Sequence, residues 1–153
     1  ACENYLKLYH EIYGIDYTVF RIAIPFGELN PVSAKYGIVS KLQEQSIDGE
    51  ITLFGSGDSV RTFTHIKNIC EILYSGSLMK QTLNDIFNIG GKTYSLFEIA
   101  SVFADKYKSH IVYKPWPNNL YKLEIKNGRL SSEKLDAVLQ TDYIDIKDYL
   151  KNH

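Results

Sequence analysis

The chain has 153 residues, of which 44% are hydrophobic, and its formal net charge is −1. This length and apolar content fit one compact domain, and the near-neutral charge gives no electrostatic footprint for nucleic acid or an anionic membrane. No apolar stretch approaches the roughly twenty residues that span a bilayer, and no basic segment followed by an apolar one opens the chain. We therefore expect no membrane partner. The two cysteines have neither metal-ligand spacing nor the pattern of a disulfide framework, so a cytoplasmic location is the default expectation.

The first two elements are predicted from the opening residues. Residues 1–14 have apolar side chains at helical spacing and end in a glycine, which predicts a helix. No capping residue precedes Ala1, so this helix is expected to be cut from a longer one. The run 16–24 is apolar on both faces, which is typical of a parallel strand covered by helices on both sides.

Helical and strand-like segments alternate after this strand. The further helices are predicted at 35–48, 65–76, 95–107, 131–139 and 145–152, and the further strands at 51–54, 86–91 and 110–114. Ser95 and Glu98 form a capping box at the start of one of these helices. The alternation predicts an α/β or mixed α+β layered domain, in which ligands collect at the loops beyond the strand ends.

One loop after a predicted strand contains a pair of glycines and an arginine, in the sequence LFGSGDSVRTF (53–63). It matches the dinucleotide fingerprint poorly, because Val60 stands where the third small residue should be and no helix begins there. Residues 60–64 are instead β-branched and aromatic, as in a strand. The loop is better explained as a turn that delivers Arg61, whose planar guanidinium suits bidentate phosphate contact. A structural arginine at the surface is the alternative.

Four segments follow one another as YGIDYTVFRIAIPFG, ITLFGSGDSVRTFTHIKNIC, FNIGGKTYSLFEIA and LEIKNGRLSSEKLDAVL. In this order the chain resembles the C-terminal half of the extended short-chain dehydrogenase/reductases, the NAD-dependent sugar-nucleotide epimerase/dehydratase family. The resemblance implies that residues 1–27 are the last Rossmann helix and strand, and that residues 28–153 form a mixed α+β nucleotide-sugar-binding subdomain. It also implies a parent enzyme that uses NAD or NADP for transient hydride transfer at a sugar carbon.

The catalytic Tyr-x-x-x-Lys pair of that family is not in this sequence. The family's A-x-E corresponds to Ala1-Cys2-Glu3, which would put the lysine just before Ala1. Tyr143 and Lys147 have the same spacing but lie far downstream, where chance explains them. The glycine-rich cofactor turn is missing too, so we expect the chain alone to be inactive, with no catalytic residue and no bound NAD or NADP. Pro25 is the one residue expected near the cofactor.

The resemblance implies that the partner is a nucleotide-diphosphate sugar. Arg61 matches the arginine that grips the diphosphate, and Thr52 and Phe54 match positions whose backbone and ring frame the base. The other candidate substrate contacts are Lys35, Tyr36, Lys114 and Arg129. No histidine has partners at metal-ligand spacing, so no metal site is expected.

Two further expectations follow from the resemblance. Many relatives pair through a bundle that includes the helix at Ala1, which allows a homodimer with Leu6, Tyr9 and Tyr13 as contacts. Three residues depart from the family pattern, namely Ile24, Thr62 and Lys67. These departures leave open an alternative, a non-catalytic nucleotide-binding or regulatory protein on a degenerate version of the fold.

Overall fold

The computed structural model describes residues 2–27, 37–117, 120–123 and 125–153. The elements in chain order are α1 (Cys2–Tyr13), β1 (Thr18–Ile22), β2 (Ile24–Phe26), α2 (Ile38–Ile47), β3 (Glu50–Phe54), β4 (Val60–His65), α3 (Ile66–Leu78), η1 (Lys80–Thr82), β5 (Asp85–Ile89), β6 (Lys92–Ser95), α4 (Leu96–Tyr107), β7 (His110–Lys114), η2 (Leu120–Leu123), β8 (Asn127–Gly128), α5 (Glu133–Asp136) and α6 (Ile146–Asn152). No helix in the described ranges is long and apolar enough to cross a membrane.

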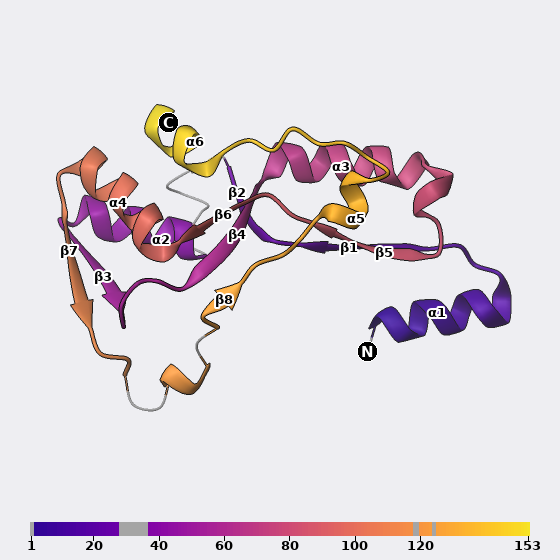
Figure 1. Ribbon diagram of the computed structural model, residues 1–153, viewed down its shortest axis with the longest axis horizontal. Helices are drawn as coiled ribbons and strands as arrows, with labels where there is room; N and C mark the ends of the chain where they lie inside the picture. Colours follow the sequence, from indigo (N-terminus) through magenta and orange to yellow (C-terminus); the bar gives the residue numbers. More distant parts are fainter. Residues whose placement is uncertain (1, 28–36, 118–119, 124) are drawn as a thin grey trace.

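The strands form three small groups, most of whose pairs are parallel. β1 pairs with β5 and β3 pairs with β7, both in parallel. The middle group has the order β2-β4-β6, with the short β8 also on β4, and only the β4–β6 pair is antiparallel. Figure 1 shows β1 and β5 running toward one end of the molecule, and β3 and β7 at the other. The predicted α/β fold class, of mixed α and β elements, is thus confirmed.

Two predicted elements differ from the observed ones. The predicted strand 16–24 is two strands, β1 and β2, which pair with β5 and β4 in different groups. The chain leaves the first pair at Ala23, whose N–H still donates to the carbonyl of Ile89 (3.2 Å). Strand β6 was not predicted, because it is short and directly precedes a helix with a strong capping signal. That signal is confirmed, since Ser95 and Glu98 form both hydrogen bonds of a capping box at α4.

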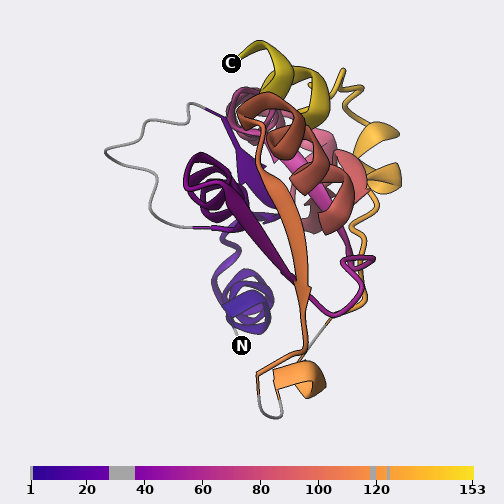
Figure 2. The same ribbon diagram turned by 90° about the vertical axis from the view of Figure 1, so that its left-hand side faces the viewer.

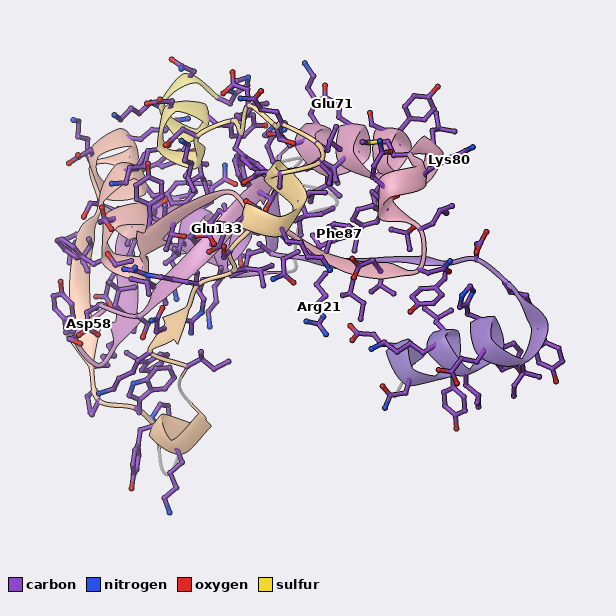
Figure 3. The ribbon with its side chains drawn as sticks, turned by 45° about the vertical axis from the view of Figure 1, so that its right-hand side comes forward. Arg21, Asp58, Glu71, Lys80, Phe87 and Glu133 are labelled. Atoms are coloured by element: carbon purple, nitrogen blue, oxygen red, sulfur yellow. The ribbon has the colours of Figure 1, made fainter. Side chains whose placement is uncertain are left out.

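Two clusters of buried side chains hold these elements together. The larger one joins β2, β3 and β4 to α2, α4 and α6, with Phe63, Ile99 and Phe103 almost fully buried. The smaller one joins β5 to α3 and α5 around Phe87, which Figure 3 shows beside β5. The candidate site described below is built on the larger cluster. The proposed division at residue 27 stays a prediction, although β5, from much later in the chain, joins β1.

Helix α1 lies apart from both clusters (Figure 1) and has no buried residue. Glu3 accepts two hydrogen bonds from Arg21 of β1, at 2.8 and 2.6 Å, and Figure 3 shows Arg21 projecting on the side where α1 lies. Tyr9 and Tyr13 are more than half exposed. An exposed apolar helix of this kind is available for packing against further protein. The predicted homodimer through this helix nevertheless stays a prediction.

Candidate functional site

Strand β3 turns an unpaired backbone edge toward helix α2. The N–H of His110 donates to Gly49 (3.1 Å) and the N–H of Gly55 donates to Lys114 (3.0 Å), so the odd-numbered residues of β3 face β7. Because backbone direction alternates along a strand, Thr52 and Phe54 face the other way. The Thr52 N–H donates to Oε1 of Gln45 (3.1 Å). The Thr52 carbonyl and the Phe54 N–H have no hydrogen-bond partner within the described part of the chain.

A cavity of about 90 Å³ lies beside this edge, and two aromatic residues are among those that line it. The rings of Phe54 and Trp116 have centroids 5.4 Å apart and planes tilted by 31°. Gly55, with φ +69°, makes room for the indole, since a Cβ there would lie 3.0 Å from Nε1 of Trp116. The other residues that line the cavity are Ile38, Lys41, Leu42, Leu53, Gly57 and Leu96, together with Thr52 and Gln45. Aromatic and aliphatic walls with polar groups along one side suit a planar heterocycle.

Arg61 is held by backbone contacts on one side of its guanidinium. It is the second residue of β4, where it pairs with Tyr94 of β6 and with Gly128 of β8. Its Nη1 donates to its neighbour's carbonyl, that of Val60 (2.7 Å), and to the carbonyl of Ile125. Gly128 leaves room for this side chain, because a Cβ there would lie 3.0 Å from Cδ of Arg61 and would press on the arginine. Its remaining N–H groups have no partner among the described residues and are available to an anion.

The other predicted cations behave differently from one another. Arg129 directly follows β8 and is the neighbour in sequence of Gly128, with which Arg61 pairs. Its side chain is exposed and has no ion pair in the described part of the structure. Lys114 lies opposite Phe54 at the end of β7, but its Nζ reaches back to Oε1 of Glu50 (3.2 Å). This contact lowers the pKa of Glu50. The structure therefore places Arg129 directly after the strand that pairs with the strand of Arg61, and it gives Lys114 a carboxylate partner.

Three predicted residues lie elsewhere. Lys35 and Tyr36 are outside the described residues. Pro25 lies in β2 opposite Thr64 and does not line the cavity. No group of three or more histidine, cysteine, aspartate or glutamate residues in the described ranges is placed to hold a metal ion.

The ends of β3 and β7, the start of β4, and β8 gather at one end of the molecule. Figures 1 and 2 show this grouping from two directions. Asp58, in the loop between β3 and β4, lies at the same end (Figure 3) and accepts a hydrogen bond from Ser56 at 2.6 Å. Loops beyond the carboxyl ends of parallel strands are where open sheets collect ligands, and the strand ends here carry a cavity and two arginines.

Two residues of this site were not recognised from the sequence as ligand contacts. Neither Trp116 nor Gln45 is among the candidate contacts predicted from the sequence. Gln45 lies seven residues before Thr52, so its role depends on how α2 is rotated against β3, which the helical pattern does not state. A tryptophan beside prolines after a strand was the only available signal for Trp116.

Comparison with known proteins places the chain among enzymes of one family. Residues 1–90 match the NAD dependent epimerase/dehydratase family. A Methanocaldococcus jannaschii protein, provisionally named UDP-glucose 4-epimerase, is 25% identical over 158 residues, which cover 99% of this chain and 51% of that protein. The Thermotoga maritima UDP-glucose 4-epimerase, solved with UDP-glucose, has a TM-score of 0.81 at 24% identity over 97% of this chain and 48% of its own.

A third similar structure is the Bacillus cereus UDP-glucuronic acid 4-epimerase, in complex with UDP-glucuronic acid and NAD. It has a TM-score of 0.80 at 22% identity, over 97% of this chain and 47% of its own. The chain thus spans about half the length of each of these relatives. Because the family match covers residues 1–90 of 153, the chain belongs to the NAD-dependent epimerase/dehydratase family.

Proposed function

We propose that this chain is the nucleotide-sugar-binding part of an NAD-dependent epimerase, dehydratase or reductase. The cavity beside β3 would take the base, and Arg61 with Arg129 would bind the diphosphate. The observation that carries this proposal is the open edge of β3, where Thr52 and Phe54 line a cavity beside Trp116 and leave a backbone carbonyl and a backbone N–H without partners among the described residues. The solved relatives that contain UDP-glucose and UDP-glucuronic acid support the same class of ligand.

The size of the cavity limits what it can hold. Pockets that enclose a complete small ligand have volumes of about 300–1,000 Å³, whereas this one has about 90 Å³. Only one end of a ligand, such as a single ring, fits inside, and the rest must lie along the strand ends. The phosphates would then lie toward β4 and β8, where a guanidinium with free N–H groups gives bidentate contacts.

The loop that contains the glycine pair does not fit the dinucleotide cofactor of the family. The glycine pair Gly55 and Gly57 leads into strand β4, so it gives a bound pyrophosphate no helix N-terminus. We therefore assign NAD to the parent enzyme and derive no step through it from these residues. We likewise propose that the chain alone binds the sugar nucleotide without catalysing a reaction.

The alternative, a non-catalytic regulatory protein, is favoured by the three departures from the family pattern. Thr62 is buried between β6 and the segment after β8, and Lys67 pairs with Glu71 at 4.0 Å, so both have local structural roles here. Neither role requires a bound sugar nucleotide. A lack of affinity for every sugar nucleotide would support this alternative.

Calorimetric titration with UDP-, dTDP-, CDP- and GDP-sugars tests the proposal. Arg129→Ala is the variant of choice, because Arg129 is exposed and its side chain makes no hydrogen bond or ion pair with the described residues. Losing one charged hydrogen-bonding partner removes roughly 1.5–3 kcal/mol, so we expect affinity to fall about 10- to 150-fold.

The matched control is Lys80→Ala, which removes an exposed cation beyond the end of α3, away from the site (Figure 3). This variant should bind like the wild type. Equal affinities in the two variants, or no binding of any sugar nucleotide by the wild type, would contradict the proposal.

A further inference from the structure

The amide of Gln45 has a defined orientation. Gln45 lies on α2 and lines the cavity beside β3. The Thr52 N–H can only donate, so the group facing it at 3.1 Å must be the amide oxygen, Oε1. The amide nitrogen is therefore turned away from that N–H, and it has no hydrogen-bond partner among the described residues. The free amide donor is bonded to the same carbon as Oε1 and so lies at the same edge of β3.

Three hydrogen-bonding groups now follow one another along this edge of the cavity. They are the Gln45 amide nitrogen, the Thr52 carbonyl and the Phe54 N–H, which are a donor, an acceptor and a donor. The imide edge of uracil and thymine presents carbonyl, N–H and carbonyl, which is the complementary order. Cytosine presents an amino group where the imide has a carbonyl, and guanine presents an amino group beside its ring N–H. Cytosine or guanine at this edge would therefore place at least one donor opposite a donor, or one acceptor opposite an acceptor.

We infer that Gln45 determines base specificity at this site, by making the cavity selective for uracil or thymine over cytosine and guanine. The inference rests on the proposed function, since it assumes that a nucleotide base enters the cavity. The volume of about 90 Å³ agrees with it, because a single pyrimidine ring needs less room than a purine. Phe54 and Trp116 accept any planar ring, so the polar edge has to make the choice.

The test exchanges one atom of the pattern. In Gln45→Glu a carboxylate oxygen still accepts from the Thr52 N–H, but the second oxygen replaces a donor by an acceptor. Calorimetric titration with UDP, dTDP, CDP and GDP is expected to show UDP and dTDP at least about tenfold tighter than CDP and GDP in the wild type. In Gln45→Glu the ratio of UDP to CDP affinity should fall about tenfold.

The matched control is Gln43→Glu, on the same helix. It makes the same change of charge at a residue whose amide donates to the hydroxyl of Tyr107 (3.3 Å) and does not line the cavity. Its UDP to CDP ratio should equal that of the wild type.

The outcomes separate this inference from the function on which it rests. Equal wild-type affinities for UDP and CDP, or an unchanged ratio in Gln45→Glu, would overturn the role of Gln45 while leaving nucleotide binding intact. A lack of binding of all four nucleotides by the wild type would overturn the proposed function and this inference together. The wild-type preference is itself a test, so the inference stays falsifiable even where Gln45→Glu folds poorly.

Discussion

Thr62→Val is the perturbation that most directly tests how the arginine site is held. Thr62 is 1% exposed and lies in β4, next to Arg61. Its hydroxyl accepts a hydrogen bond from the N–H of Leu130 (3.0 Å) and shares one with the hydroxyl of Thr93 (2.8 Å). Valine has nearly the same shape without the oxygen, so the substitution leaves the packing and removes both bonds.

The expected cost follows from the groups left without partners. An unpaired buried polar group costs about 1–3 kcal/mol, and Thr93 is only half-buried, so water can replace part of its loss. We expect about 2 kcal/mol in the free energy of unfolding, with a fall in Tm of roughly 4–8 °C for a chain of this size. Urea unfolding followed by the fluorescence of Trp116, the single tryptophan, measures it, and the m-value should not change.

Thr141→Val is the control, because its hydroxyl makes a long contact of 3.4 Å to the carbonyl of Leu139 and otherwise interacts with Tyr143, away from the arginine site. It should change the free energy of unfolding by less than about 0.5 kcal/mol. A Thr62→Val variant as stable as this control would refute the reasoning that the Thr62 hydroxyl fixes the segment carrying Arg129. The same variant should also weaken nucleotide binding, because that segment includes the Ile125 carbonyl that holds Arg61.

Two further predictions concern the body that supports the site. Glu98 accepts a hydrogen bond from Nζ of Lys147 at 2.7 Å, and this bond is the main reason that the pKa of Glu98 is lowered. Glu98→Gln should therefore lower the free energy of unfolding by about 0.2–1 kcal/mol near pH 7. A carboxyl whose pKa is lowered on folding stabilises the protein at pH values above its ordinary pKa of 4.5, and this stabilisation is lost as the pH falls through the pKa of the folded state. The stabilities of wild type and Glu98→Gln, measured by denaturation, should therefore converge toward about pH 3. A difference in stability that stays constant with pH would contradict this. Gly91, with φ +152°, would place a Cβ 2.1 Å from the Phe63 carbonyl oxygen, so Gly91→Ala should lower stability by more than about 3 kcal/mol. Gly14→Ala is the control, because a Cβ at Gly14 would have no atom within 4 Å, so only backbone strain at φ +66° should lower stability, by about 1–2 kcal/mol. Equal falls in Tm for the two alanine variants would contradict this prediction.

The local signals in the sequence determined the order and type of most elements. The capping box at Ser95 and Glu98, the apolar helical stripe of α4 and the β-rich run of β7 all depend on neighbouring residues, and the structure has them where the sequence predicts them. The strand β6 was missed because its signal is short and overlaps the cap of the next helix. Loop 53–63 was correctly predicted to lead Arg61 into a strand rather than to start a helix.

Tertiary structure alone decided which side chains meet. Arg61 and Gly128 are far apart in the sequence, and only the pairing of β4 with β8 brings them together. The orientation of the Gln45 amide depends on the rotation of α2 against the free edge of β3, which a helical period leaves open. The sequence by itself thus determined local structure and family, because those follow from near neighbours and motif order. Only the folded chain decided the polar edge of the cavity and the partner of Lys114, because both depend on register between segments distant in sequence.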